Sequence, residues 1–280
     1  MVLYLGIDGG GTGCRAAIAD ARGRILGQGT GGPANINSDP EGAVVSILAA
    51  ATGAMVQADT TPAQVIAVLG LAGGNMTEAA RRTEASLPFA RCRVLNDAVI
   101  AARGAIGEGD GILVAIGTGS IFAVQQGGAL RLHGGRGFLL GDEGSGAVLG
   151  RTLLSEAMRA GDGFAPDSPL LRDLRDRMGG FEGIIAFGNR AAPAEFAQLA
   201  RRLVEDRDDP AAMRIMDAAA AQVSHAVEVL QGTGDLPVTC TGGLGPFYAQ
   251  VLERRWTVTP ARGSATDGAI AIARELGVPA

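Results

Sequence analysis

The most informative feature of the chain is a repeated pattern. Residues 11–29 read GTGCRAAIADARGRILGQG and residues 117–135 read GTGSIFAVQQGGALRLHGG, so Gly-Thr-Gly opens both at an offset of 106 residues (117 minus 11). Each copy follows an apolar segment and continues as an apolar hairpin with glycine in its turn. A shared tripeptide can arise by chance. Its matching flanks favour two related halves, each starting with a strand, a glycine-rich turn and a hairpin.

The first glycine-rich turn is a candidate phosphate-binding loop. Asp8 ends an apolar segment and is followed at once by the run from Gly9 to Gly13. Glycines let an anion approach main-chain N–H groups closely. A Walker A loop is excluded because the chain has no lysine, so its 24 basic residues are all arginine. A dinucleotide fingerprint requires a helix after the glycines, whereas residues 14–27 predict a strand, a turn and another strand.

The rest of the chain predicts alternating helices and strands. Asp39-Pro40-Glu41 is a helix start, with proline at an early position and acid in the first turn. The expected elements are a helix from 39 toward 55, a strand at 64–71, a helix at 77–86, a strand at 93–96 and a helix from about 98. The first half therefore has the order β-β-β-α-β-α-β-α. The second half restarts with three strands, carries a larger helical portion at 143–230, and ends with a strand at 237–241, two short helices and a helix at 266–276.

Composition limits the classes of function. The chain has 280 residues, of which 47% are hydrophobic and 19% charged, as in soluble globular proteins. A formal charge of -5 argues against binding to nucleic acid or to a membrane surface. Three separated cysteines and two isolated histidines predict reduced thiols and no metal cluster. With no secretory signal or membrane-spanning run visible, we expect a cytoplasmic protein.

Several segments resemble one family. IDGGGT (7–12) is typical of the actin-like ATPases, which include sugar kinases, heat-shock chaperones and actin. LNDAVIAA (95–102), AIGTGS (115–120) and GGRGFLLGDEGSG (134–146) resemble more narrowly the N-acetylglucosamine kinase and glucosamine kinase branch of the BadF/BadG/BcrA/BcrD-type ATPases. TGGL (241–244) resembles the adenosine-side loop. The resemblance covers essentially the whole chain, and GDEGSG is its most specific part.

The resemblance implies an α/β fold of two lobes. This is the actin-like ATPase (ribonuclease H-like) fold, in which each lobe is a mixed sheet with βββαβαβα order and flanking helices. We expect the N-terminal lobe to comprise residues 1–110, with the helix at 265–280 packing back on it. The C-terminal lobe would comprise residues 111–264 and include a helical insertion.

The resemblance also implies that ATP and Mg²⁺ are the cofactors. In the family the two glycine-rich turns face each other across a cleft and hold the ATP phosphates. Asp8 would hold Mg²⁺ through water, since Mg²⁺ prefers oxygen ligands and keeps much of its hydration; an acid that caps a turn is the alternative. The expected ATP-binding residues are Asp8, Gly10, Gly11, Thr12 and Gly13 from the first turn, Gly117, Thr118, Gly119 and Ser120 from the second, and Gly242 and Gly243.

Asp97 matches the general base of the family. A carboxylate within hydrogen-bond reach can take the proton of a sugar hydroxyl as the bond to phosphorus forms. On sequence alone, Asp97 is an equally good N-cap of the helix that follows it. The residues that match sugar-contacting positions are Asn35, Asp97, Gly119, Gly135, Arg136, Gly137 and Asp142. For Asn35 the alternative is turn chemistry, and for Asp142 it is a helix cap.

Two positions depart from the family pattern. Arg136 stands where many relatives carry an aromatic residue, and Ile121 stands where the vertebrate enzyme has a sugar-contacting asparagine. The choice among N-acetylglucosamine, glucosamine and N-acetylmuramic acid therefore stays open. An arginine at position 136 would favour an anionic sugar such as a muramic acid derivative.

The resemblance predicts an ATP-dependent amino-sugar kinase that phosphorylates the 6-hydroxyl of N-acetylglucosamine or glucosamine. Its partners would be the sugar, ATP and, as in relatives, a second copy in a homodimer. One alternative is an ATPase that activates a 2-hydroxyacyl-CoA dehydratase-type enzyme, but Cys14, Cys92 and Cys240 lack the spacing of its iron–sulfur ligands. Another is a catalytically silent sugar sensor, which the retention of Asp8 and Asp97 disfavours.

Overall fold

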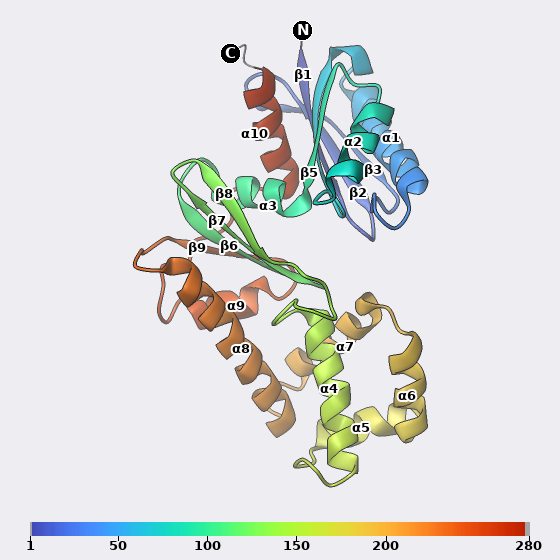
Figure 1. Ribbon diagram of the computed structural model, residues 1–280, viewed down its shortest axis with the longest axis vertical. Coiled ribbons are helices and arrows are strands. Elements are labelled where there is room, and N and C mark those ends of the chain that lie inside the picture. The colour runs from blue at the N-terminus through green and yellow to red at the C-terminus, as the bar shows by residue number, and fades with distance from the viewer. Residues whose placement is uncertain (1, 278–280) are drawn as a thin grey trace. The chain divides into compact units, whose positions relative to one another are not determined.

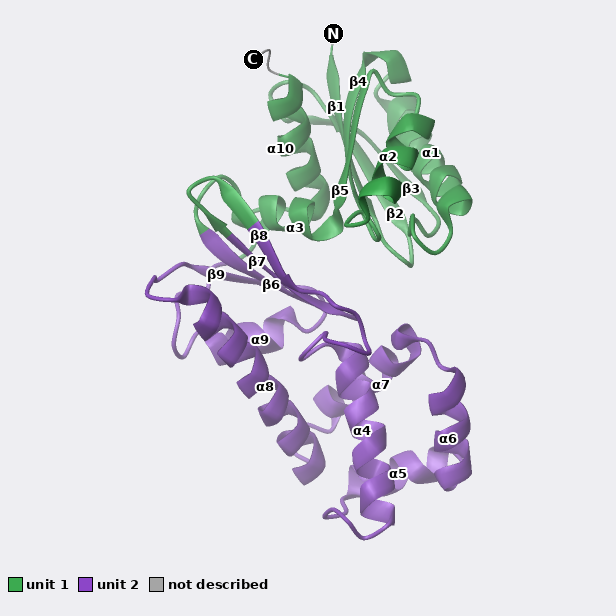
Figure 2. Ribbon diagram, viewed as in Figure 1, with its two compact units in different colours: residues 1–110, 125–130, 260–280 green, residues 111–124, 131–259 purple. Residues whose placement is uncertain are grey.

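The computed structural model describes residues 2–277 and divides into two compact units (Figures 1 and 2). The first unit consists of residues 1–110, 125–130 and 260–280, and the second of residues 111–124 and 131–259. These limits differ from the expected domains in two places. The tip of a hairpin, 125–130, groups with the first unit, and the final boundary lies at 259 instead of 264.

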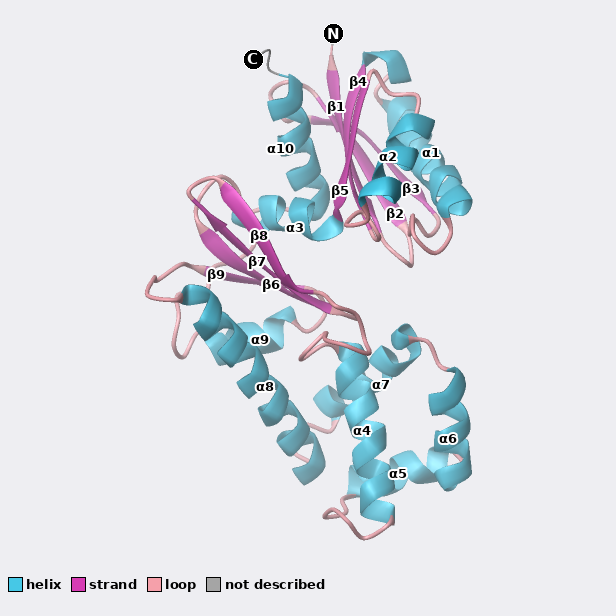
Figure 3. Ribbon diagram, in the orientation of Figure 1, coloured by secondary structure: helices cyan, strands magenta, loops and turns pink. Residues whose placement is uncertain are grey.

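The sheet of the first unit has five strands in the order β3-β2-β1-β4-β5 (Figure 3). β1 (Leu3–Gly9), β2 (Cys14–Ala19) and β3 (Ile25–Gly31) form an antiparallel meander. β4 (Val65–Leu71) pairs parallel with β1, and β5 (Arg91–Asn96) pairs parallel with β4. The β1–β2 connection is the first Gly-Thr-Gly turn, as the sequence predicts.

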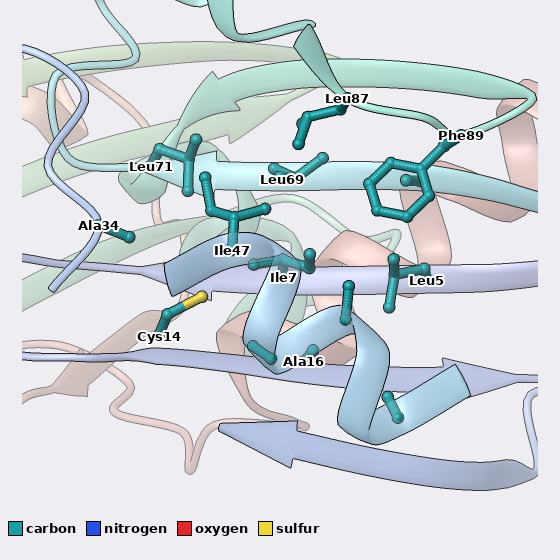
Figure 4. Close-up of a cluster of buried hydrophobic side chains, with 14 of the residues drawn as sticks. Leu5, Ile7, Cys14, Ala16, Ala34, Ile47, Leu69, Leu71, Leu87 and Phe89 are labelled. Atoms are coloured by element: carbon teal, nitrogen blue, oxygen red, sulfur yellow. The ribbon is translucent and has the colours of Figure 1, made fainter. Parts of the chain in front are cut away.

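Helices cover both faces of this sheet. They are α1 (Pro40–Gln57), α2 (Thr77–Ser86), α3 (Asp97–Ile106) and α10 (Ala265–Gly277), with a short 3-10 turn, η1 (Pro62–Gln64). Successive side chains of a strand point to opposite faces. Leu69 therefore packs in the cluster that contains Ile47 of α1 (Figure 4), while Val68 packs with Ile100 of α3 and Ala269 of α10. The expected β-β-β-α-β-α-β-α order is confirmed here, with α10 completing one face.

The second unit repeats the plan with a shorter sheet. β6 (Gly111–Ile116), β7 (Ser120–Gln126), β8 (Ala129–Gly134) and β9 (Val238–Thr241) take the order β8-β7-β6-β9, with β9 parallel to β6. The strand that would follow β9 in the βββαβαβα order is reduced to a single parallel bridge between Val238 and Val258. The second Gly-Thr-Gly turn joins β6 to β7.

Five helices lie between β8 and β9, where the larger helical portion was predicted. They are α4 (Gly146–Gly161), α5 (Pro169–Arg177), α6 (Gly180–Arg190), α7 (Pro193–Glu205) and α8 (Pro210–Gln231). α9 (Gly245–Leu252) follows β9. The sequence predicted two short helices there, but residues 253–264 form only turns and the bridge. None of the helices that the structure describes is both long enough and apolar enough to cross a bilayer.

Candidate active site

The first Gly-Thr-Gly turn is tied to the fold through its carbonyl groups. The N–H of Ala34 donates to the carbonyl of Gly10 at 2.8 Å. In a trans peptide the C=O and the next N–H point in opposite directions, so the N–H of Gly11 points away from Ala34. The N–H of Gly10 itself donates to the carbonyl of Gly13 at 2.9 Å. At Gly10 the N–H therefore closes the hairpin, and the outward-pointing donor of this turn is the N–H of Gly11.

The second turn is anchored to the start of α4. The carbonyl of Gly117 accepts from the N–H of Gly146 at 2.8 Å, and that of Thr118 accepts from the N–H of Ala147 at 3.1 Å. By the same peptide geometry, the N–H groups of Thr118 and Gly119 point away from α4. The N–H of Gly117 donates to the carbonyl of Gly119 at 2.9 Å. Each turn thus directs backbone N–H groups outward while its carbonyls are bonded within its own unit.

Several glycines of these loops have no conformational or packing reason to be glycine. A Cβ added to Gly10, Gly11, Gly117 or Gly243 would meet nothing within 4 Å, and none of the four has a positive φ. Gly242 is different. Its φ is +85°, and an added Cβ would lie 2.3 Å from the carbonyl oxygen of Ile116, so the fold itself requires glycine there. The four open glycines instead keep the backbone accessible from outside.

Ser120 lies at the end of the second turn but does not expose its hydroxyl. Its side chain is buried, and its Oγ has no hydrogen-bond partner among the described residues. Ser120 begins β7, and its backbone N–H lowers the pKa of the nearby Asp142 carboxyl group. The accessible donors of this turn are therefore backbone groups and the hydroxyl of Thr118, which is exposed.

Asp8 lies near the carboxyl end of β1, on the same face of the sheet as Arg15. The two residues are directly opposed on β1 and β2, and the side chains of such a pair lie on one face. Burial raises the pKa of Asp8, the negative charge of Asp97 raises it further, and Arg15 opposes both. A half-buried carboxylate close to a second one is a favourable place for a cation.

The donor set fits Mg²⁺ held largely by water. Among the described residues, no three His, Cys, Asp or Glu side chains group closely enough to enclose a metal. Asp8 would therefore supply a protein oxygen beside the open Gly11 backbone, and this suits an ion that keeps several water ligands and also binds phosphate. The alternative reading, in which Asp8 only caps a turn, finds no support, since no hydrogen bond to its carboxylate comes from the described part of the turn.

Asp97 follows β5 directly and is the first residue of α3. The helix cap is Asn96, whose side chain accepts from the N–H of Ala98 at 3.0 Å. Asp97 also accepts from this N–H, at 2.9 Å, but the cap position predicted for it belongs to its neighbour. Burial raises the pKa of Asp97, and the N–H of Ala98 partly offsets this effect.

The backbone of β4 lets Asp97 approach the sheet. Gly70 pairs with Asp8 on β1 and with Leu95 on β5. A Cβ at Gly70 would lie 3.2 Å from the Cα of Asp97 and closer still to Ile100. A side chain at this position would push the start of α3 outward. Glycine between the two strand ends therefore helps to keep Asp8 and Asp97 close enough to influence each other.

Asp142 is a strained and buried acid in the second unit. Its φ is +59°, a left-handed conformation that is uncommon outside glycine, and it is only 8% exposed. The cap of α4 is Ser145, so Asp142 does not have the capping role that was its alternative. Burial raises the pKa of Asp142, and the N–H groups of Ser120 and Gly137 partly offset this.

Gly119 leaves room for this acid. A Cβ at Gly119 would lie 2.9 Å from a carboxylate oxygen of Asp142. Two further expected sugar contacts, Gly135 and Gly137, have positive φ values of +63° and +83°, and Arg136 between them is exposed. In the second unit, Gly119 of one loop and Gly137 of the other therefore lie near Asp142.

The side-chain oxygen of Asn35 stabilises a turn. The Oδ1 accepts from the N–H of Asn37 at 3.0 Å and from that of Ser38 at 3.2 Å. The turn chemistry considered from sequence is thus realised, and only the side-chain amide NH₂ is left to meet a ligand. Its neighbour Ala34 is the residue that bonds to the first Gly-Thr-Gly turn.

The sequence prediction missed Arg15. It is exposed, and the ion pairs of the described residues do not include it. A signal was present, because a hairpin that closes between Gly10 and Gly13 necessarily places position 15 opposite position 8. Arg15 is the cation next to Asp8 in a chain that has no lysine.

The cysteines do not form a cluster site. Cys14, Cys92 and Cys240 are all free, and burial raises the pKa of each thiol to about 12. They belong to different strands, β2, β5 and β9. Protonated, scattered thiols are unsuited to hold an iron–sulfur cluster within this chain.

Comparison with known proteins gives relatives that cover most of the chain. The chain is 32% identical to glucosamine kinase GspK of Vibrio cholerae serotype O1, over 98% of this chain and 96% of that protein. It is 30% identical to the N-acetylmuramic acid/N-acetylglucosamine kinase of Clostridium acetobutylicum, over 87% of this chain and 85% of that protein.

Solved structures agree with the fold. The crystal structure of a candidate N-acetylglucosamine kinase from Chromobacterium violaceum matches with a TM-score of 0.89 and 31% identity, over 98% of this chain and 99% of that one. A glucokinase of the ROK family from Streptomyces griseus, at 22% identity and a TM-score of 0.63 over 98% and 99%, shares the fold. The model of the BadF/BadG/BcrA/BcrD ATPase family matches residues 5–259. Since this match spans most of the sequence, the chain belongs to the BadF/BadG/BcrA/BcrD ATPase family.

Proposed function

We propose that this protein is an ATP-dependent amino-sugar kinase that transfers the γ-phosphate of ATP to the 6-hydroxyl of glucosamine or N-acetylglucosamine. Two relatives at 30% identity or more, matched over 85% or more of their length, are named as kinases of amino sugars. The family is a family of ATPases. The substrate class and the nucleotide are thus supported by similarity, and the roles of individual residues rest on their environment.

The observation that carries the proposal is the pair of open glycines, Gly11 and Gly117, in the two Gly-Thr-Gly turns. Neither needs to be glycine for its φ or its packing. The N–H of Gly11 in the first turn and those of Thr118 and Gly119 in the second point away from the fold. An incoming phosphate needs this combination, because a Cβ would keep its oxygens away from the backbone donors.

Asp97 would act as the general base. As the sugar hydroxyl oxygen forms its bond to the γ-phosphorus, the bond from phosphorus to the β–γ bridging oxygen breaks and ADP leaves. The hydroxyl proton passes to the Asp97 carboxylate. The charge that develops on the transferred group would be met by the backbone N–H groups of the turns and by the guanidinium of Arg15. Mg²⁺ near Asp8 would neutralise phosphate charge when bound.

Asp142 would bind sugar hydroxyls. The N–H groups of Ser120 and Gly137 favour its ionised form by lowering its pKa, and a carboxylate can accept hydrogen bonds from sugar hydroxyls. Gly119, Gly135, Arg136 and the amide of Asn35 are the further proposed contacts. A strained backbone at a buried acid is typical of a binding position.

An ADP-coupled assay tests the proposal. The purified protein would be supplied with ATP, Mg²⁺ and, separately, glucosamine, N-acetylglucosamine, N-acetylmuramic acid, glucose and mannose. We expect ADP release that depends on an amino sugar, with the product phosphorylated at the 6-position by NMR. Tight sugar binding without ADP release would indicate a sensor instead. An iron-containing preparation whose ATP hydrolysis is independent of sugar would indicate an activator.

A further inference from the structure

A large groove runs along one face of α4 in the second unit. It has a volume of about 870 Å³. Arg151, Leu154, Ser155 and Met158 line it from α4, at the spacing of one helix face. Residues 136–140 form another wall, and α6, α7 and Ala191 between them contribute the remainder. The groove lies outside the turns that are proposed to bind phosphate.

The floor of the groove is apolar. Leu154, Ile184 and Phe196 are almost fully buried, and the ring of Phe138 lies 5.0 Å from that of Phe196. At the rim, Leu139 and Leu140 are 82% and 85% exposed. Two adjacent leucines with so much exposed surface are costly in water. The groove therefore suits a ligand with a hydrocarbon portion.

Two arginines give the groove a positive end. The guanidinium of Arg151 lies 4.9 Å over the ring of Phe138 and donates to the Phe138 carbonyl at 3.3 Å. Arg136 is exposed, and no acidic side chain among the described residues pairs with it. Oxygen atoms of a ligand would therefore be favoured near residue 136, with its carbon chain further along α4.

The groove adjoins the proposed sugar site. Gly137 lines the groove, and its N–H is close enough to Asp142 to lower the pKa of that carboxyl group. A sugar held by Asp142 would thus lie beside the arginine end of the groove. A substituent of that sugar is the part of the ligand that the groove can receive.

We propose that the groove binds the acyl chain of an N-acylated amino sugar longer than N-acetyl, with the acyl oxygen near Arg136 and the carbons along α4. This inference rests on the proposed function, because it takes the sugar itself to lie at Asp142. It deepens that function by naming the substrate class: amino sugars with an extended acyl group.

The test is a series of ligands that differ only in chain length. Binding of glucosamine and of its N-acetyl, N-butanoyl and N-hexanoyl forms would be measured by titration calorimetry, and kcat/KM by ADP release. Each methylene placed in the groove should tighten binding by about two- to fourfold, since a fully buried methylene contributes about 0.8 kcal/mol. Affinity that is flat or falls from acetyl to hexanoyl would overturn the inference.

A groove-filling variant makes the test specific. Ser155 is exposed on the groove face of α4, so Ser155→Trp fills the groove without disturbing a core position. This variant should abolish the increase in affinity with acyl chain length and leave glucosamine turnover unchanged. Arg201→Trp, on an exposed position of α7 outside the groove, is the matched control and should keep the gain.

The remaining outcomes are also decisive. Equal losses for glucosamine and the hexanoyl sugar in Ser155→Trp would contradict a chain-binding groove. A dimer in light scattering that Ser155→Trp dissociates would assign the groove to a second copy of the chain. If no amino sugar is phosphorylated but binding still tightens with chain length, the kinase proposal fails while the groove assignment stands.

Discussion

The negative charge of Asp97 raises the pKa of Asp8. Asp97 follows the end of β5 and Asp8 lies near the end of β1, with Gly70 of β4 between the two strands. When two partly buried carboxyl groups lie near each other, ionisation of both is unfavourable unless a cation is bound or one of them keeps its proton. We therefore propose that the pair binds two positive charges: Mg²⁺ at Asp8 and the proton of the sugar hydroxyl at Asp97.

Replacing the proposed base should affect turnover more than binding. Asp97→Asn keeps the shape of the side chain but removes its ability to accept a proton. We expect kcat to fall by about 10²- to 10⁴-fold, with the Kd for ATP changed less than about threefold. Steady-state kinetics and calorimetry measure the two quantities. An Asp97→Asn enzyme with near-normal kcat would refute the assignment.

The acid pair should make stability depend on pH. Because the folded-state pKa of Asp8 is raised, the folded state holds more protons between the unfolded-state value, about 3.9, and the raised one. Stability therefore falls as pH rises through this window. We expect Asp8→Asn to unfold at a temperature higher by about 2 °C or more at pH 7, and the difference to disappear near pH 3. Calorimetric scans without Mg²⁺ measure it, and a variant less stable than the parent at pH 7 would contradict it.

Alanine at the open glycines should separate folding from ATP binding. At Gly11 and Gly117 an added Cβ meets nothing and φ is not positive, so Gly→Ala should leave the unfolding temperature unchanged or raise it slightly. The KM for ATP should nevertheless increase about tenfold or more, which corresponds to about 1.4 kcal/mol. Gly163→Ala is the control for a strained glycine, since φ there is +79°, and it should lower stability with no change in the KM for ATP.

Arg15 should support the chemical step. Without this cation, charge on the transferred phosphate is less well stabilised, and the pKa of Asp8 rises further. We expect Arg15→Gln to lower kcat/KM for ATP by about 10- to 100-fold and to move the acid limb of the pH profile to higher pH, with partial recovery in Arg15→Lys. Arg93→Gln, at an exposed position of β5, is the matched control. Equal kinetics in the two glutamine variants would exclude the role of Arg15.

Asp142 should contribute to sugar affinity through its carboxylate and to stability through its backbone. Asparagine also tolerates a left-handed conformation, so Asp142→Asn should fold normally and raise the KM for the sugar by about tenfold. Asp142→Ala should show the same KM change and a lower unfolding temperature as well, because alanine adopts φ near +59° only with strain. A normal sugar KM in both variants would remove Asp142 from the site.

Patterns that depend on local sequence predicted much of the fold. The bounds of α2 agree with the predicted helix at 77–86, because loops that contain glycine or proline flank this segment. β4 was predicted because its seven residues form an uninterrupted apolar run, and all seven are buried in the structure. The duplicated Gly-Thr-Gly hairpin located both sheets. The segment after α9 was mispredicted as a second helix, since the bridge from Val258 to Val238 uses a contact that local sequence does not reveal.

The site was predictable by residue type and less so by bonding. The acids and glycines were found from spacing and resemblance. Three details depend on contacts in the folded structure. The N–H of Gly10 closes the hairpin, the hydroxyl of Ser120 is buried, and Asn96, not Asp97, caps α3. Arg15 could have been found from hairpin register alone.

The single bridge beside β9 has a consequence for association between molecules. An uncovered strand edge offers its peptide groups to any extended chain that meets it. Here Val238 donates to the carbonyl of Thr257 and accepts from the N–H of Thr259, and the hydroxyls of Thr239 and Thr259 lie 3.0 Å apart. These bonds occupy the edge of β9, and the strand is only four residues long. Few unpaired peptide groups therefore remain on which another chain could add a strand.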